Sequence, residues 1–342
     1  MHGGTALLAP GGRTDRTPET VQGKGAMETD ATPLLARATI DTATHHRVDR
    51  EWLDKAWSDP STRVLVLDGG PPGSRGWSTP HPRRSRSLVT TEGPRRLALT
   101  TPERAPEGER YFLGVDEGIA HFAVRSTDAL TEPEGTAAAS LGEIGALLGD
   151  RDTGLLTRAV ALANWNATHR FCPRCGGPTR IANAGHMRVC EREGDEQYPR
   201  TDPAVIMLVH REKEGREEVL LGNNPRWEAE RYSVLAGFVD AGESLEQAVA
   251  REVAEEAGVV VARPRYLSSQ PWPFPRSLMM GYTARAVGET ERTDDEIGDL
   301  RWFTRAELAD AVQEGRVRLP GPVSIAHTLI EHWYGGELSG GW

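Results

Sequence analysis

The chain has 342 residues, of which 38% are hydrophobic and 26% charged. This is the composition of a globular protein, and the length suits about two domains. The formal net charge of −10 argues against a protein that coats nucleic acid, since such binding neutralises phosphates with Lys and Arg. No apolar run approaches the ~20 residues of a membrane-spanning helix, and the N-terminus lacks the basic lead of a signal peptide. We therefore expect a cytoplasmic protein that does not enter membranes.

The N-terminal half is predicted to begin with a disordered segment, because residues 1–30 are rich in Gly, Thr and Pro and lack an apolar period. Short strands bounded by turn residues follow, at 64–68, 87–91, 96–101, 111–116 and 120–126. Helical patterns come next, at 140–149 and 155–169. An Arg-bearing loop separates the first two strands and carries Arg75, Arg83, Arg84 and Arg86. A solvated loop is the favoured interpretation, and contact with phosphate is the alternative.

The C-terminal half shows an α/β pattern from Ala204 onward. Strands are predicted at 204–210, 218–222, 232–240, 259–268, 278–287 and 300–303. A charged helix at 244–257 and a final helix at 322–334 complete the pattern. We therefore predict four segments: a disordered 1–30, a β-rich domain 31–168, a cysteine-bearing knuckle 169–200, and an α/β domain 201–336.

Three glutamates on the charged helix are the first candidates for chemistry. Glu252, Glu255 and Glu256 stand at i, i+3 and i+4, so one helix face presents three carboxylates that repel one another. A hard divalent cation such as Mg²⁺ or Mn²⁺ relieves that repulsion. A solvated acidic face balanced by Arg251 is the alternative, and the triplet alone favours it.

The residues around the triplet change this balance. The stretch from Gly237 to Val259 reads G-x5-E-x7-R-E-U-x-E-E-x-G-U, where U is aliphatic. Glu243, Arg251 and Gly258 fill the remaining fixed positions. The pattern resembles the box of the Nudix hydrolases, which cut a nucleoside diphosphate linked to another group. The resemblance implies an α/β/α sandwich in which the box forms a strand, a loop and a helix.

The same resemblance implies roles for individual residues. Glu252 and Glu256, with the carbonyl of Ala236, would hold the cation, and Glu255 would ligate a further cation or take the proton of the attacking water. A further carboxylate often comes from a later loop, and Glu296 lies at the matching place, beside Asp294 and Asp295.

A proline-rich stretch, SQPWPFPRS at 269–277, holds two large aromatic rings. Proline lacks an amide hydrogen, so the segment is neither helix interior nor central strand. Trp272 and Phe274 can stack on a flat base, and the prolines keep the rings pre-arranged. A proline-rich ligand for another domain and a wedge of core aromatics are the alternatives.

The stretch resembles the second motif of the NADH pyrophosphatases among the Nudix hydrolases. The resemblance extends from Phe171 to the final helix and implies a set of substrate-binding residues. They are Tyr198, Gln270, Pro271, Trp272, Pro273, Phe274, Pro275, Arg276, Ser277 and Ala326.

The chain has three cysteines, an odd count that points to a metal site or free thiols rather than a disulfide scaffold. Cys172 and Cys175 form a C-x2-C turn, and Cys190 follows. The family resemblance implies a structural Zn²⁺ held by four cysteines, but Glu193 occupies the fourth position. Glu193 or His186 would supply the fourth ligand, and an absent metal is the alternative.

Taken together, the residues and the resemblance predict an enzyme that hydrolyses NAD(H) to NMN(H) and AMP and removes NAD caps from RNA 5′ ends. Family members are typically homodimers, and the sequence permits this. Two alternatives stay open: a Nudix hydrolase of another nucleoside diphosphate such as ADP-ribose, and a non-catalytic module that binds nucleotide or RNA.

Overall fold

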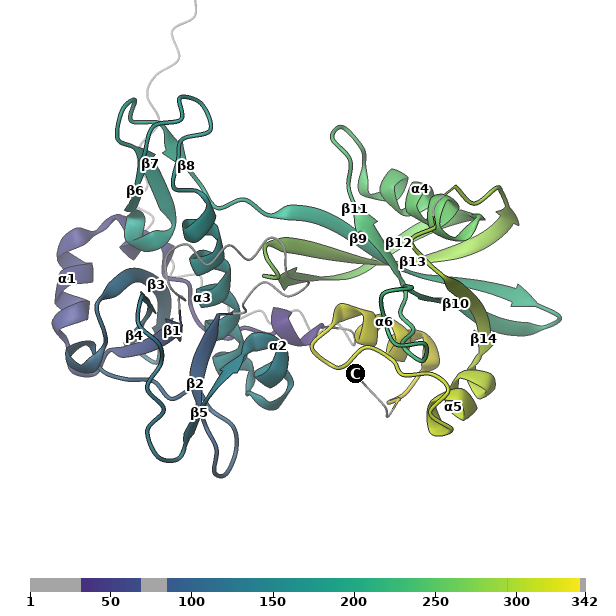
Figure 1. The fold of residues 1–342 in the computed structure, drawn as a ribbon, viewed down its shortest axis with the longest axis horizontal. Coiled ribbons are helices and arrows are strands. Elements are labelled where there is room, and N and C mark those ends of the chain that lie inside the picture. The colour runs from purple at the N-terminus through teal and green to yellow at the C-terminus, as the bar shows by residue number, and fades with distance from the viewer. Residues whose placement is uncertain (1–31, 69–84, 294, 339–342) are drawn as a thin grey trace, which may run out of the picture. The chain divides into compact units, whose positions relative to one another are not determined.

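The computed structural model describes residues 32–68, 85–293 and 295–338 (Figure 1). The segment predicted to be disordered, the loop arginines Arg75, Arg83 and Arg84, and Asp294 lie outside the described residues. In the described part of the chain, no helix is long and apolar enough to cross a membrane.

The first sheet has the strand order β3-β4-β1-β2-β5. Its strands are β1 (Arg63–Asp68), β2 (Arg86–Thr90), β3 (Gly108–Asp116), β4 (Ile119–Ser126) and β5 (Thr136–Ser140). Only β1 and β4 are parallel to each other among these pairs. The strand predicted at 96–101 is wrong, because Leu97 bridges to Val89 whereas Thr100 bridges to Val64. Single bridges to two different strands build no continuous ladder.

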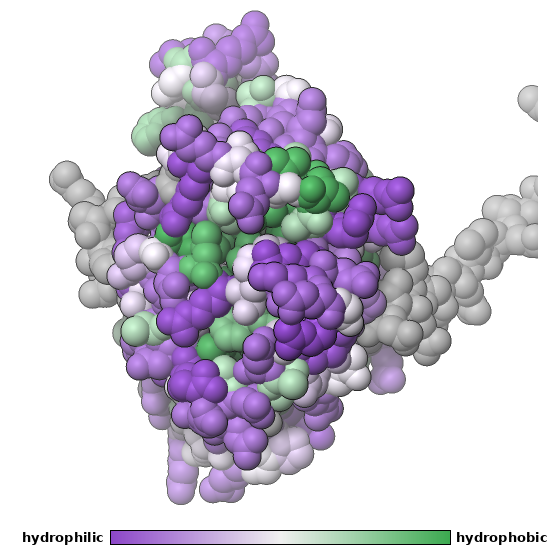
Figure 2. All heavy atoms as spheres, turned by 90° about the vertical axis from the view of Figure 1, so that its right-hand side faces the viewer, coloured by the Kyte–Doolittle hydropathy of each residue, from purple (hydrophilic) through white to green (hydrophobic). Residues whose placement is uncertain are grey.

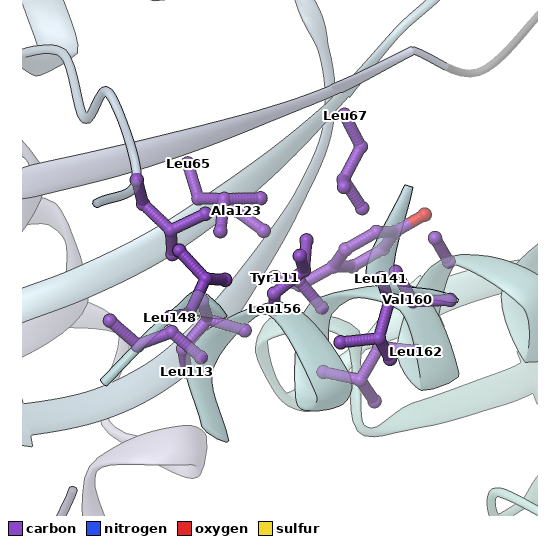
Figure 3. Close-up of a cluster of buried hydrophobic side chains, with 14 of the residues drawn as sticks. Leu65, Leu67, Tyr111, Leu113, Ala123, Leu141, Leu148, Leu156, Val160 and Leu162 are labelled. Atoms are coloured by element: carbon purple, nitrogen blue, oxygen red, sulfur yellow. The ribbon is translucent and has the colours of Figure 1, made fainter. Parts of the chain in front are cut away.

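Helices cover this sheet and complete its core. They are α1 (Arg50–Ser58), α2 (Leu141–Ile144) and α3 (Asp150–Thr168). Side chains of the sheet and of α3, among them Tyr111 and Leu156, gather in one buried cluster (Figure 3). Both of these side chains are 0% exposed. The long helix α3 is therefore fixed along its length by the core.

A small antiparallel sheet follows α3. Its strands are β6 (Thr179–Ala182), β7 (Met187–Cys190) and β8 (Glu196–Gln197). Arg188 lies 5% exposed at its base and donates to Asn166 Oδ1 at 3.1 Å and to the Thr179 carbonyl at 2.8 Å. This buried guanidinium joins the small sheet to the end of α3.

The third sheet is mixed and has the strand order β12-β13-β9-β10-β14, with β11 paired to β9. Its strands are β9 (Asp202–Lys213), β10 (Arg216–Asn223), β11 (Leu235–Phe238), β12 (Val259–Trp272), β13 (Ser277–Glu289) and β14 (Asp299–Thr304). Its helices are α4 (Leu245–Ala257), α5 (Arg305–Gln313) and α6 (Ile325–Tyr334).

Two separate cores show that helices cover both faces of this sheet. Val249 of α4 packs with Val205 and Val209 of β9. The alternate β9 residues Ile206 and Leu208 pack instead with α5 and α6. Since side chains alternate along a strand, the two cores lie on opposite faces. The predicted α/β/α sandwich is confirmed.

The outer surface of this region is largely polar. On the face shown in Figure 2, hydrophilic residues predominate and hydrophobic residues form small separate groups. Scattered apolar residues of this kind are ordinary on a protein surface.

Candidate active site

Helix α4 is defined at both ends by its sequence. The Ser244 hydroxyl accepts from the Gln247 amide at 3.2 Å, and Gln247 Oε1 accepts from the Ser244 amide at 2.9 Å, forming a capping box. Gly258 ends the helix with φ 64°, in the left-handed region that glycine tolerates. Ala248 and Val253 are 0% exposed against the sheet. The packed stripe thus fixes which helix face carries the glutamates.

Arg251 connects the carboxylates of the candidate site. Its Nε and Nη2 donate to the two carboxylate oxygens of Glu243 at 2.9 and 2.8 Å. Its Nη1 donates to Glu252 Oε1 at 2.9 Å and to Glu255 Oε2 at 3.1 Å. These hydrogen bonds lower the pKa of Glu243 below its ordinary value and raise the pKa of Arg251. One guanidinium thereby holds three carboxylates in place.

Glu252 lies directly over the backbone of β11. A Cβ added to Gly237 would be 2.0 Å from the Glu252 carboxylate carbon, so any larger residue there would displace this side chain. Ala236, the preceding residue, pairs with Ile206 of β9. Burial raises the pKa of Glu252 above its ordinary value of 4.5, although the hydrogen bond from Arg251 acts in the opposite direction.

The other two glutamates of α4 differ in exposure. Glu255 has a side chain that is 43% exposed, whereas Glu256 is 3% exposed. The loop that carries Glu296 is attached to the same end of the helix. The Thr293 amide donates to the Glu255 carbonyl at 3.2 Å, and the Thr290 amide donates to the Gly258 carbonyl at 2.9 Å. Glu296 is exposed and follows Thr293 by three residues, so its loop starts at the C-terminal end of α4.

The α4 carboxylates are not gathered as tightly as a closed metal cage. Among the described residues, three or more His, Cys, Asp or Glu ligand atoms come within 4.8 Å of one another only at the cysteines. Mutual repulsion and the bonds to Arg251 explain the spacing of the glutamates. Their oxygen donors nevertheless suit a hard divalent cation.

The proline-rich stretch forms the tip of the β12–β13 hairpin. Trp272 pairs with Ser277, and β12 is an edge strand of its sheet. This confirms that the prolines keep the segment out of helices and central strands. The Trp272 and Phe274 rings lie 4.9 Å apart at 77°, and both pack against the core of the first sheet. Part of each ring is thus already covered by protein.

The register of the third sheet relates this hairpin to Glu252. Ser269 pairs with Met280, Met280 with Val205, and Val205 with Gly237. Three strand spacings of ~4.8 Å separate Ser269 from Gly237. Ser269 faces α4 with Gly237, so Gln270 faces the opposite side of the sheet.

Three of the predicted substrate-binding residues are buried: Gln270, Ser277 and Ala326. Gln270 is 0% exposed and its Nε2 donates to the Val323 carbonyl at 3.0 Å, while its Oε1 has no hydrogen-bond partner among the described residues. Ala326, in the first turn of α6, is 1% exposed. Ser277 is also buried. In this structure Gln270 supports the hairpin from beneath, and contact of these three with a substrate stays a prediction.

The remaining predicted residues lie nearer the surface. Arg276 Nε donates to Asp202 Oδ2 at 2.9 Å, which ties the hairpin to the start of β9. Tyr198 is 50% exposed and donates its hydroxyl to Glu196, and this bond raises the pKa of Tyr198. Pro271 is half-buried, Pro273 is buried and Pro275 is exposed.

Phe238 is a candidate that the sequence analysis missed. It follows Gly237 directly, is 60% exposed, and its carbonyl accepts from Arg251 Nη2 at 2.9 Å. An exposed aromatic ring can stack on a base, but side chains alternate along β11, so this ring lies on the sheet face opposite to Glu252, as Gln270 does. The sequence feature that points to Phe238 is a large apolar residue immediately after Gly237, the first glycine of the box.

The three cysteines form a compact group of potential ligands. Their Sγ atoms lie within 4.8 Å of one another, and Cys175 and Cys190 have Sγ atoms 3.5 Å apart. The amides of Gly177 and Glu193 point at sulfur at 3.4 Å. The hydrogen bond from Glu193 lowers the pKa of Cys190, which favours the thiolate that a metal requires. This donor set fits Zn²⁺.

Neither candidate for the fourth ligand lies with the three cysteines. The Glu193 carboxylate lies 3.9 Å from Arg174 Nε and is not among the gathered ligand atoms. The alternative ligand, His186, is not among the gathered ligand atoms either, and its Nε2 bonds the Phe112 carbonyl at 2.7 Å.

The arginines flanking the loop between β1 and β2 are occupied where the structure describes them. Arg86 pairs with Asp68 at 3.1 Å, and Arg95 donates to the Thr90 carbonyl at 2.8 Å. The loop itself lies outside the described residues, so its interpretation as a solvated loop stays a prediction.

Three family models match successive stretches of the chain. The NUDIX domain model matches residues 200–320, the NADH pyrophosphatase zinc ribbon domain matches 167–198, and the NADH pyrophosphatase-like rudimentary NUDIX domain matches 78–165. The α/β/α sandwich and the carboxylates of α4 define a Nudix hydrolase.

A relative along most of the chain narrows this class. The NAD-capped RNA hydrolase NudC of Mycobacterium bovis is 39% identical over 318 residues, covering 88% of this chain and 94% of the relative. Human NAD-capped RNA hydrolase NUDT12 is 39% identical over 199 residues, covering 54% and 42% of the two chains. A Nudix hydrolase structure from Nitrosomonas europaea is 21% identical with a TM-score of 0.36, covering 49% and 95%. The chain belongs to the NudC family of Nudix hydrolases.

Proposed function

We propose that the enzyme hydrolyses the pyrophosphate of NAD(H), giving NMN(H) and AMP, and removes NAD caps from RNA to leave 5′-monophosphate RNA. The observation that carries this proposal is the placement of Glu252 over Gly237, held through Arg251 in one group with Glu243 and Glu255. The SQPWPFPRS hairpin of the same sheet and the names of the relatives support the choice of NAD. The three free cysteines suit a cytoplasmic enzyme.

The site suits Mg²⁺ or Mn²⁺ because its donors are all hard oxygens. Glu252, Glu256 and the Ala236 carbonyl would hold the cation, with Glu296 reaching in from its loop. When bound, the cation neutralises the diphosphate and lowers the pKa of a water ligand. Glu255, the more exposed carboxylate, accepts the proton of the attacking water.

Arg251 and Glu243 are proposed to position the catalytic carboxylates rather than to contact the reacting groups. Arg251 holds Glu252 and Glu255 at a set separation, and Glu243 fixes the guanidinium through two hydrogen bonds. The substrate therefore meets carboxylates whose positions are already restricted, which reduces the ordering cost of catalysis.

Trp272 and Phe274 are proposed to grip the dinucleotide, and their placement supports a homodimer. Trp272 lies two residues beyond Gln270, on the sheet face opposite to Glu252, because the pairing from Ser268 to Trp272 is regular. One protomer thus presents its rings and its carboxylates from opposite faces. A second copy would bring the hairpin of one protomer to the glutamates of the other.

The three cysteines are proposed to hold a structural Zn²⁺, with Glu193 turning from Arg174 to supply the fourth ligand. The small sheet β6–β8 buries too little apolar surface to be stable alone, so a metal would contribute directly to its folding.

The function is tested by comparing kcat/KM for NADH, NAD⁺, ADP-ribose and NAD-capped RNA with Mn²⁺ present. We expect the nicotinamide dinucleotide, free or as a cap, to be the preferred substrate. A preference for ADP-ribose would reject the choice of substrate, and binding without turnover would indicate a non-catalytic module.

A further inference from the structure

The tip of the β12–β13 hairpin cannot fix its own shape with backbone hydrogen bonds. Pro271, Pro273 and Pro275 supply no amide hydrogen. The turn makes one internal bond, from the Phe274 amide to the Trp272 carbonyl at 2.7 Å. The carbonyls of Pro273 and Pro275 therefore need donors from elsewhere in the protein.

One side chain of helix α3 supplies both donors. Asn164 Nδ2 donates to the Pro273 carbonyl at 2.9 Å and to the Pro275 carbonyl at 3.1 Å. The carboxamide carries two N–H groups, so it can serve both acceptors at once. Asn164 is more than one hundred residues away along the chain from either proline, so these contacts belong to the tertiary structure.

Asn164 stands on a rigid support. Its neighbours Ala163 and Trp165 are 0% and 1% exposed, so the helix cannot rotate without disturbing the core. The Trp272 and Phe274 rings pack against the same core, beside which Val323 also packs. Backbone carbonyls and rings of the hairpin are thus positioned by one surface.

We propose that Asn164 is a positioning residue for substrate binding, through which the first domain sets the location of the Trp272 and Phe274 rings. The inference rests on the proposed function, in which these rings contact the dinucleotide. It assigns a role to the first domain, since a rigid hairpin binds without first having to be ordered.

The test is a double-mutant cycle on KM for NADH with Mn²⁺ present. Asn164→Asp keeps the shape but replaces the two donors by an oxygen that repels the proline carbonyls. We expect KM to rise about tenfold with kcat nearly unchanged, as for two lost hydrogen bonds. In Trp272→Ala protein, whose ring is absent, the same substitution should raise KM no further.

Thr168→Ala is the matched control on the same helix, because among the described residues its hydroxyl bonds the backbone carbonyls of Asn164 and Trp165 and the His169 ring rather than the hairpin. It should leave KM unchanged. If Asn164→Asp unfolds at the assay temperature, Asn164→Gln, which displaces the amide by one methylene, replaces it with the same expectation.

The inference would be overturned by an unchanged KM in the Asn164 variants. It would also be overturned if the Asn164 substitution raised KM equally in wild-type and in Trp272→Ala protein. Failure of the proposed function has a different signature: wild-type protein would leave NADH intact, so no KM could be measured.

Discussion

Arg251 explains how Glu252 and Glu255, two of the three α4 glutamates, can share one turn of a helix. Its hydrogen bonds to Glu243, Glu252 and Glu255 offset the repulsion that the sequence alone suggests. An acidic face balanced by Arg251 and a face that binds a divalent cation are therefore compatible interpretations of these glutamates. The arginine stabilises this arrangement of carboxylates, and their oxygens suit a cation.

Gly237 is predicted to be indispensable at the residue scale. In Gly237→Ala the new Cβ would lie 2.0 Å from the Glu252 carboxylate carbon and would displace that side chain. We expect NADH turnover at limiting Mn²⁺ to fall by about two orders of magnitude, since small misplacements of reacting groups have such effects. Gly149→Ala, which places its Cβ in open space, is the control. Wild-type turnover by Gly237→Ala would contradict the geometry.

The pH dependence of cation binding should reflect Glu252. Burial raises its pKa, so it stays protonated to a higher pH than an ordinary glutamate. The proton and the cation compete for this carboxylate, and the apparent Mn²⁺ affinity should fall as the pH is lowered toward its pKa. Without a cation, the stability of the fold should change with pH in the opposite direction to the Mn²⁺ affinity. Because the folded state binds the Glu252 proton more tightly than the unfolded state, the free energy of unfolding falls as the pH rises through this pKa. Mn²⁺ titrations of activity across pH test the prediction, and an affinity independent of pH would contradict it.

At the scale of elements, strongly patterned segments could be predicted and short ones could not. The charged helix and the strands of the third sheet were predicted within a few residues, because their apolar periods are long. Strand β5 was missed because Thr136–Ser140 contains three alanines and little β-branched character. Helices α1 and α5, of nine residues each, were also missed.

In the candidate site too, features set by local spacing could be predicted from the sequence, whereas contacts between distant residues could not. The glutamates could be predicted because their spacing lies within one helix. The burial of Gln270 could not, since it depends on Val323, which is distant in the sequence. The contact of Asn164 with the hairpin is equally invisible to local patterns.

The cysteine-bearing element offers a prediction about its metal. Purified protein should contain one Zn²⁺ per chain, and Glu193→Gln should bind it more weakly because a neutral amide is a poorer ligand. Glu193→Cys should bind it more tightly than wild type. Zinc content and thermal unfolding measure both effects. Equal zinc affinity in all three proteins would exclude Glu193 as a ligand.

At the scale of the whole molecule, the proposed homodimer predicts complementation. Glu255→Gln lacks the base and Trp272→Ala lacks the ring, so each should be weakly active alone. If the partner's ring completes each site, a mixed dimer holds one site with both groups. Random mixing should then restore about a quarter of the wild-type sites. Activity that stays at the average of the two variants would show that each site is built within one protomer.

The central claim is that the carboxylates of α4 direct metal-dependent cleavage of a pyrophosphate. It is tested most directly by mass spectrometry of NADH after incubation with Mn²⁺ and either wild-type or Glu255→Gln protein. We predict NMNH and AMP from the wild type, and a loss of at least about a hundredfold in rate for a variant that remains folded. Intact NADH with the wild-type protein, or equal rates for the two proteins, would contradict the account.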